Sequence, residues 1–332
     1  MNIDFSIKNV NYNEKIRSLT TKASGVVKSN KFFPVYCINS TEYIFKPLSK
    51  TKPFTTPLFS YAEVVWSYIT NKYFCYAPQY QLSLCVGYEE KEKKYYDNGC
   101  LVECIVDESE HLVNLLEYFR EHKDKNVDID NYVNYCMQFY DYVPIFKSDI
   151  IMENTKLGEE LALQVLLSIL KADQNFHYEN VMFICDNKNN IKKMAPMLDH
   201  EFSTMFLFPD NISYNIYYFD KFLKTLADEN GVIRKNMDYI RENYPQIFST
   251  FMDGINELYK SIDGLKLQNK GFMFACNSFL YEAGIERYKN NNEEKAKELE
   301  QDIKLHDINL EIVNAIICYE IKKSIEAIKY IY

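Results

Sequence analysis

Residues 171 to 184 read "KADQNFHYENVMFI", and this stretch constrains the fold more than any other part of the sequence. An apolar helical pattern precedes it, and an apolar run typical of a strand follows it. Eight residues between these two patterns carry Asp173, Asn175, His177, Glu179 and Asn180. Carboxylate, imidazole and amide groups gathered in one loop between two core elements indicate a functional loop rather than a generic polar turn.

The length and charge of the chain limit its function classes. Its 332 residues predict two domains or two lobes. With 38 Lys and Arg against 47 Asp and Glu, the net charge is −9, which excludes broad nucleic-acid binding through a basic face. A small basic pocket for a phosphate is still compatible with this balance.

The cysteines and the N-terminal sequence indicate where the protein resides. Its nine Cys show neither a Cys-x-x-Cys motif nor a zinc-ligand spacing with His, as expected of free thiols in a reducing cytosol. The start of the chain lacks an apolar signal core, and no apolar run approaches the ~18 residues that span a membrane. We therefore expect a cytoplasmic protein without membrane contact, with export by a non-classical route left open.

The first third of the chain predicts mainly strands. Residues 32–46 have the pattern of a β-hairpin, and residues 60–74 have the spacing of a helix. Two more strands are expected in 80–88 and 100–106, joined by a charged turn over 89–99. These elements predict a β-rich lobe with one helix over residues 1–107.

The remaining chain, residues 108–332, predicts a larger helical lobe. Apolar faces indicate helices at 111–122, 129–143, 158–172, 218–230 and 247–262 and from 293 onward, and a hairpin at 181–199. We expect the C-terminal helix to pack on this larger lobe. The fold class is therefore α+β with two lobes, and ligand sites are common in the cleft between such lobes.

Two residues of the first lobe fit the needs of phosphoryl transfer from ATP. This reaction uses a Lys on a strand to neutralise phosphates and a Glu on the next helix to hold that Lys. Lys46 ends a predicted strand, and Glu63 lies in the helix that follows. The structural alternatives are a solvated edge-strand Lys46 and a capping box formed by Ser60 and Glu63.

Two residues of the second lobe fit a Mg²⁺ site. Asn180 precedes a strand, and Asp199 follows the strand run "MAPML" at the end of the predicted hairpin. Amide and carboxylate oxygens are ligands that hard cations accept. The alternatives are a turn Asn180 and an Asp199 that caps a helix. The order of these residues along the chain, after Lys46 and Glu63, is the one that ATP-dependent phosphoryl transfer requires.

These motifs together resemble those of the HipA-like serine/threonine kinases, and among them most resemble the short CtkA-type proinflammatory kinases. The likeness covers residues 20–205 in ordered pieces. It is carried by "EYIFKPLSK", "SYAEVVWSYI", "ECIVDESEHLVNLLEY", "DQNFHYEN" and "KMAPMLDHEFS". The fourth matches a family loop written Asn-x-Asp-x-His-x-x-Asn, and the fifth matches Ala-Pro-x-x-Asp. The resemblance implies a bilobal, protein-kinase-like fold that uses ATP and Mg²⁺.

The resemblance also implies a role for each matching residue. Lys46 would contact the ATP phosphates, Glu63 would pair with it, and Asn180 and Asp199 would hold Mg²⁺. His177 would occupy the place of the family's loop histidine.

The nucleotide contacts implied in the first lobe are less closely matched to the family. The backbone around Glu103 and Ile105 would meet adenine. Ser24, Gly25 and Lys28 would lie in the phosphate-covering loop, although this stretch has a single Gly and fits a surface turn equally well.

The chain departs from the family at the catalytic base. Asn175 stands five residues before Asn180, where the family has Asp. An amide does not accept a proton from an attacking hydroxyl at neutral pH, and general-base help is worth about 10²–10⁴-fold. Three explanations stay open: Asp173 replaces the base, the protein is a natural pseudokinase, or the sequence is an intentionally inactivated variant.

Three functions follow from these observations. The first is ATP- and Mg²⁺-dependent phosphoryl transfer to Ser or Thr of a protein substrate, impaired or blocked in this chain by Asn175. The second is a nucleotide-binding pseudokinase that serves as an interaction module, and the third is a small-molecule kinase. Whether a regulatory or antitoxin partner exists is open, and no nucleic-acid partner is expected.

Overall fold

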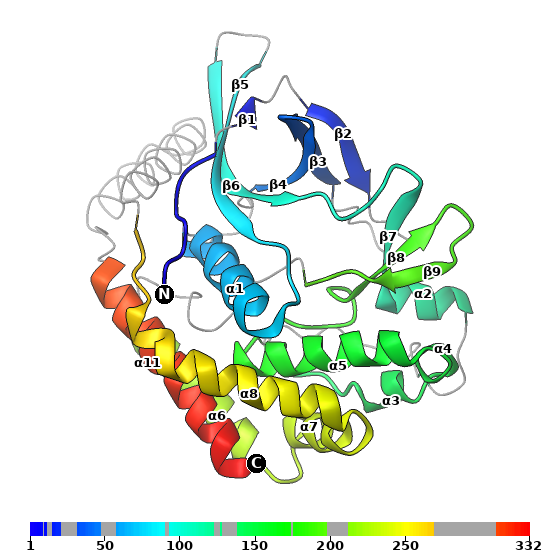
Figure 1. Cartoon of the computed structure of the whole chain (residues 1–332), viewed down its shortest axis with the longest axis vertical. Helices are drawn as coiled ribbons and strands as arrows, with labels where there is room; N and C mark the ends of the chain where they lie inside the picture. The colour runs from blue at the N-terminus through cyan, green and yellow to red at the C-terminus, as the bar shows by residue number, and fades with distance from the viewer. Residues whose placement is uncertain are drawn as a thin grey trace, which may run out of the picture.

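The computed structural model describes residues 1–8, 10–11, 15–20, 32–47, 58–89, 93–122, 127, 138–173, 175–197, 212–268 and 310–332. Within these ranges the chain forms a small β-rich lobe and a larger, mainly helical lobe (Figure 1). The predicted α+β class with two lobes is therefore confirmed. No helix of the described ranges is long and apolar enough to cross a bilayer.

The small lobe is built on a six-stranded sheet with the order β1-β5-β6-β4-β3-β2. Neighbouring strands are antiparallel, except that β1 runs parallel to β5. The strands are β1 (Val10–Asn11), β2 (Lys15–Thr20), β3 (Phe32–Ile38), β4 (Thr41–Pro47), β5 (Tyr80–Glu89) and β6 (Lys93–Glu103). One helix, α1 (Leu58–Phe74), packs beside this sheet (Figure 1).

The hairpin of β3 and β4 brings Lys46 to the middle of the sheet. Its two turn residues, Asn39 and Ser40, have φ angles of 50° and 65°, which suit the tight turn of a twisted hairpin. β4 then pairs with β6, where Lys46 lies opposite Cys100. The hairpin predicted for residues 32–46 is confirmed, and its second strand places Lys46 beside β6.

The helix α1 joins the two lobes. Its N-terminal half is part of the small lobe, with Tyr61, Val65 and Trp66 fully buried. At its C-terminal end, the Phe74 ring stacks on Phe251 with centroids 5.8 Å apart. Phe251 belongs to the helical lobe, so α1 is anchored at both ends.

The larger lobe combines a three-stranded sheet, in the order β7-β8-β9, with a set of packed helices. The strands are β7 (Glu110–Asn114), β8 (Met182–Asp186) and β9 (Ile191–Met194), and the helical elements are α2 (Leu115–His122), α3 (Val143–Phe146), α4 (Asp149–Met152), α5 (Thr155–Leu170), α6 (Ile212–Ala227), α7 (Val232–Asn243), α8 (Pro245–Ser261), η3 (Ile262–Gly264) and α11 (Leu310–Ile331). As expected, the C-terminal helix α11 packs on this lobe, against α6 and α8 (Figure 1).

Three sequence predictions are wrong in their boundaries. Residues 111–114, expected to begin a helix, form most of β7, because they pair with β8 and bury Leu112 and Val113. Residues 138–142 were expected to be helical and have no regular structure, since their backbone groups bond to side chains of other elements. The turn expected over 89–99 is shorter, because the β5–β6 ladder extends to the pair Glu89 and Lys93.

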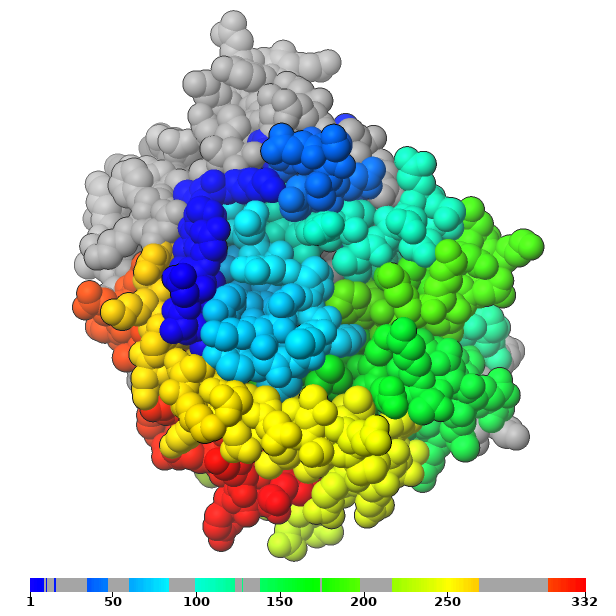
Figure 2. Space-filling view, in the orientation of Figure 1, coloured from blue at the N-terminus to red at the C-terminus, as the bar shows by residue number. Residues whose placement is uncertain are grey.

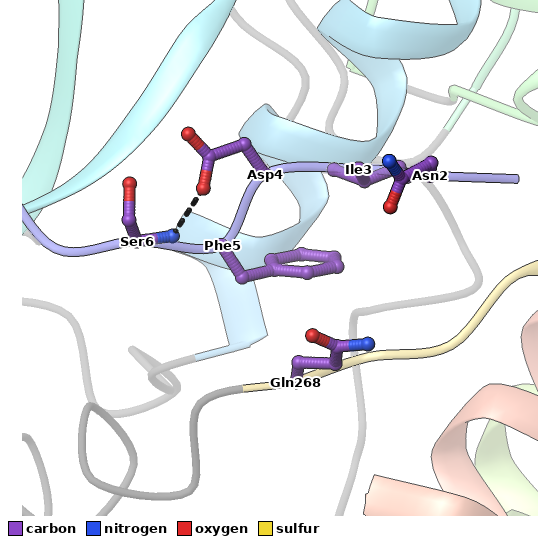
Figure 3. Close-up of a pocket in the computed structure, with 6 residues that line it drawn as sticks. All are labelled: Asn2, Ile3, Asp4, Phe5, Ser6 and Gln268. Atoms are coloured by element: carbon purple, nitrogen blue, oxygen red, sulfur yellow. Dashed lines mark hydrogen bonds between the residues drawn. The ribbon is translucent and has the colours of Figure 1, made fainter.

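The N-terminal segment crosses the surface beside α1 and above α8 (Figure 2). Its buried Phe5 lies 5.6 Å from the Tyr61 ring, measured between centroids, and its first amino group donates to Gly264 O at 3.1 Å. An open pocket of about 480 Å³ lies between this segment and Gln268 (Figure 3). None of the residues that line it is among the sequence candidates, so it is separate from the site described below.

Candidate functional site

Lys46 and Glu63 form a buried ion pair. The Lys46 Nζ lies 2.5 Å from Glu63 Oε1, with the two side chains 12% and 2% exposed. Removing two charges from water costs free energy, and this cost can exceed the attraction between them. A buried pair of this kind is therefore not explained by a gain in stability alone. The strand β4 and the helix α1 therefore bring together the two residues that the sequence analysis placed side by side.

The capping-box interpretation of Glu63 is wrong. The helix α1 begins at Leu58, so Ser60 lies inside it and does not cap it. Within the described part of the chain, the buried Ser60 hydroxyl has no hydrogen-bond partner. Glu63 is therefore held by Lys46 from another element, not by a local turn.

The loop after α5 begins with a tight reversal of the chain. The N–H of Ala172 donates to Ile169 O at 3.0 Å, and the N–H of Asp173 donates to Ser168 O at 2.8 Å. These two bonds define a Schellman motif, whose pivot residue is usually Gly. Here the pivot is Ala172, with a φ of 51°, a conformation that costs a non-Gly residue about 1–2 kcal/mol. The reversal directs residues 173–180 away from the helix axis.

Asp173 is engaged inside the protein through both carboxylate oxygens. Its Oδ1 accepts the Asn175 N–H at 3.0 Å, and its Oδ2 lies 3.3 Å from the Lys171 ammonium. The side chain of Lys171 is fully buried and that of Asp173 is 4% exposed. Asp173 thus fixes the start of the loop and neutralises a buried cation.

The two asparagines of the loop contact each other. Asn180 Nδ2 donates to the Asn175 carbonyl at 2.8 Å, and both side chains are partly buried. Within the described ranges, the Asn180 Oδ1 has no hydrogen-bond partner. The amide of Asn180 is therefore oriented through its nitrogen, and its oxygen remains available to a ligand.

His177 is a buried member of the same loop. It is 7% exposed, and its ring lies against Tyr140 with centroids 6.2 Å apart. Its Nδ1 accepts the Glu179 N–H at 3.3 Å, which assigns the ring proton to Nε2 in the neutral form. His177 thus organises the turn that leads to Asn180.

The segment implied to meet adenine follows β6 directly. The N–H of Cys104 donates to Glu42 O at 2.8 Å, which extends the β4–β6 pairing by one residue beyond Glu103. Within the described part of the chain, the backbone N–H and C=O of Ile105 have no hydrogen-bond partner. The backbone N–H and C=O of Ile105 are therefore the groups to which an adenine ring could hydrogen-bond.

Four sequence candidates lie outside the described residues, namely Ser24, Gly25, Lys28 and Asp199. The described chain before that gap is held by α5, where Gln164 donates to Ala195 O at 2.9 Å. Among the residues whose structure is described, no three His, Cys, Asp or Glu side chains gather as a metal cluster.

The sequence analysis missed three residues that support the loop. Lys171 pairs with Asp173, while Tyr142 and Asn236 bond to the backbone near the loop from other elements. The spacing of Lys171 and Asp173 was a usable signal, since a charge that directly follows an apolar helix needs a partner. No local pattern marks Tyr142 or Asn236, which come from distant parts of the chain.

Comparisons with known proteins leave the family open. No protein-family model matches the chain, and no curated protein matches its sequence. A crystal structure of a Helicobacter pylori proinflammatory kinase, CtkA, is similar over 81% of this chain and 95% of its own, with 15% identity and a TM-score of 0.41. A crystal structure of the Golgi casein kinase is similar over 93% of this chain and 72% of its own, with 12% identity and a TM-score of 0.38. Likenesses this weak carry no argument about activity.

Proposed function

We propose that this chain is a HipA-like kinase that binds ATP and Mg²⁺ between its two lobes and transfers a phosphoryl group to a Ser or Thr hydroxyl of a protein. The observation that carries this proposal is the buried Lys46–Glu63 pair, which holds an ammonium at the end of a central strand. Such a cation neutralises phosphate oxygens, and phosphoryl transfer depends mainly on positioning and charge neutralisation.

The loop offers one oxygen that fits Mg²⁺. The Asn180 Oδ1 lacks a partner among the described residues, and its amide is fixed through Nδ2. Hard cations prefer such oxygens, and we propose Asp199 as the second ligand. When bound, Mg²⁺ neutralises phosphate charge and orients the phosphates. The protein's part is to hold the amide oxygen and the Lys46 ammonium in place.

Asn175 bears on the last step of this reaction, the removal of a proton from the acceptor hydroxyl. At the place proposed for the base, its amide does not remove a proton from the acceptor hydroxyl. Asp173 lies two residues away, with both oxygens engaged by Lys171 and the Asn175 N–H. These contacts favour a positioning role for Asp173 and support a second candidate function, a nucleotide-binding scaffold without efficient transfer.

Calorimetric titration with ATP tests nucleotide binding. We expect the wild-type chain to bind ATP more tightly with Mg²⁺ than without it. Lys46→Met should weaken binding by about 10–100-fold, because it removes charge-assisted contacts worth about 1.5–3 kcal/mol. Asp199→Ala should remove the Mg²⁺ enhancement.

The matched control is Lys72→Met, an exposed lysine at the end of α1 that should leave affinity unchanged. The proposal fails if the wild-type chain gives no binding heat with Mg²⁺ and ATP, or if Lys46→Met binds as tightly as Lys72→Met.

A further inference from the structure

A short irregular segment, residues 140–142, is held by a side chain of α7. Asn236 is 3% exposed, and its Nδ2 donates to Tyr140 O at 2.7 Å. Its Oδ1 accepts the Tyr142 N–H at 2.9 Å. One amide therefore bonds on both sides of Asp141, as a neighbouring strand would. A residue needs both a donor and an acceptor for this, which an aspartate does not provide.

Residues 141 and 142 of this segment contact the loop of residues 175–180. The Tyr142 hydroxyl donates to Phe176 O at 3.1 Å, and its ring lies 5.3 Å from Phe176 and 5.2 Å from Tyr178, measured between centroids. In the opposite direction, the Tyr178 hydroxyl donates to Asp141 O. Segment and loop are thus joined by two hydrogen bonds that run in opposite directions through a buried aromatic layer.

These bonds act on the peptide units that carry the proposed chemistry. Two consecutive carbonyls are fixed, that of Asn175 by Asn180 Nδ2 and that of Phe176 by the Tyr142 hydroxyl. The peptide unit after Phe176 also carries the His177 N–H, which donates to the same Asn175 carbonyl at 3.0 Å, so a rotation of this unit would break that bond. The Tyr142 hydroxyl is thus linked to the Asn180 amide through the Phe176–His177 peptide unit and the Asn175 carbonyl.

We propose that Tyr142 and Asn236 are positioning residues that hold residues 175–180 in the geometry needed to bind Mg²⁺ with the nucleotide. This inference rests on the proposed function, since it concerns the same site. Neither residue touches the ligand. Asn236 holds residues 140–142 through their backbone, and Tyr142 in turn holds the loop through the Phe176 carbonyl.

The test is Tyr142→Phe, which removes one hydroxyl and keeps the ring. The readout is the Mg²⁺ enhancement of ATP affinity, the ratio of affinities with and without Mg²⁺. We expect this ratio to fall about tenfold, the effect of about one hydrogen bond, while Mg²⁺-free affinity at Lys46 stays unchanged. The matched control is Tyr259→Phe, which removes a similar hydroxyl bond to Glu326, between α8 and α11.

Hydrogen exchange of the ligand-free chain gives a readout that does not depend on nucleotide. Tyr142→Phe should increase amide exchange in residues 175–180, and Tyr259→Phe should leave it unchanged. The double variant Tyr142→Phe with Asn236→Ala should lower the ratio of ATP affinities with and without Mg²⁺ by less than the product of the two single effects. The reason is that both residues act through the same contact with the loop.

The outcomes separate the two proposals. If the wild-type chain shows Mg²⁺-dependent ATP binding and Tyr142→Phe has the same ratio and the same loop exchange, the positioning role is overturned and the proposed function stands. If the wild-type chain shows no Mg²⁺-dependent binding, both are overturned. A loss of thermal stability in Tyr142→Phe equal to that of Tyr259→Phe, without a change in ratio, would mean a purely structural role.

Discussion

In the proposed function, residue 175 carries an amide at the place of the catalytic base, where an aspartate would carry a carboxylate. The surrounding loop does not depend on this difference. The Asn175 N–H is bonded to Asp173 and its carbonyl is bonded to Asn180, so both contacts come from the backbone. A side chain with the same shape therefore leaves the loop in place.

Asn175→Asp should create phosphotransferase activity. We expect transfer of radiolabel from ATP to the chain itself or to a generic protein substrate to rise by the order of 10²-fold or more, since under the proposed function a carboxylate at this position would act as the general base. Asn175→Ala is the control, and it should give no gain. An Asp variant that still binds Mg²⁺ and ATP but stays inert would instead favour the scaffold function.

At the scale of elements, the packing of α1 on α8 fixes the position of Glu63. Gly254 on α8 allows this approach, because a Cβ there would lie 2.4 Å from the Phe74 ring and 2.9 Å from the Tyr73 carbonyl. Tyr73 also bonds to Ser261 through its hydroxyl, at 2.5 Å. The helix that carries Glu63 is thus seated on the larger lobe by its C-terminal turn.

Gly254→Ala should separate α1 from α8. The backbone carbonyl of Tyr73 cannot turn away as a flexible side chain can, so we expect a destabilisation of about 1–3 kcal/mol from overpacking. Urea unfolding would measure it. Asp253→Ala, at the exposed neighbouring position, should stay within about 0.5 kcal/mol of wild type. Equal stability of the two variants would show that the helices have room to move.

The sequence predicted elements best where local pattern and tertiary packing agree. The hairpin around Asn39 and Ser40 and the apolar helix α5 are such cases. Residues 111–114 are not, because their helical spacing was overridden by pairing with β8.

The candidate site was also predictable only where the sequence order itself indicates a contact. Lys46 and Glu63 could be paired from their order on a strand and the next helix. The contacts of Tyr142 and Asn236 with the loop could not, since 34 residues separate Tyr142 from Phe176, and 94 residues separate Asn236 from Tyr142.

For the molecule as a whole, one buried carboxyl couples stability to pH. Glu320 on α11 is 2% exposed, and its Oε2 has no hydrogen-bond partner in the described part of the chain. One turn later, the buried Ser324 hydroxyl also has no partner among the described residues. Burial raises the pKa of Glu320 to about 8 from its ordinary value of 4.5. The folded chain therefore retains a proton at neutral pH that the unfolded chain releases.

The sign of the effect follows from this difference in bound protons. The contribution of Glu320 to stability is fully present below pH 4.5 and is lost as pH rises towards 8. We expect the free energy of unfolding to fall across this window by at most about 1.4 kcal/mol per pH unit from this group. Glu320→Gln should remove this part of the slope in urea unfolding measured from pH 5 to 8.

Glu326→Gln is the control on the same helix. Hydrogen bonds from Lys323 and Tyr259 lower the pKa of Glu326, so its contribution to stability is lost only at acid pH. Its replacement should leave the slope between pH 5 and 8 unchanged. A Glu320→Gln chain with the wild-type slope would contradict the assignment of a neutral, buried carboxyl.

The buried Lys171–Asp173 pair also limits how the loop can change during evolution. At position 175 the codons for Asn and Asp differ by one base, and the bonds described above involve only the backbone of this residue. Position 173 is more constrained, because a neutral residue there would remove one partner of the buried pair with Lys171, and breaking such a pair costs about 3–5 kcal/mol. We therefore expect a substitution at position 173 to need a compensating change at Lys171, whereas position 175 can change alone.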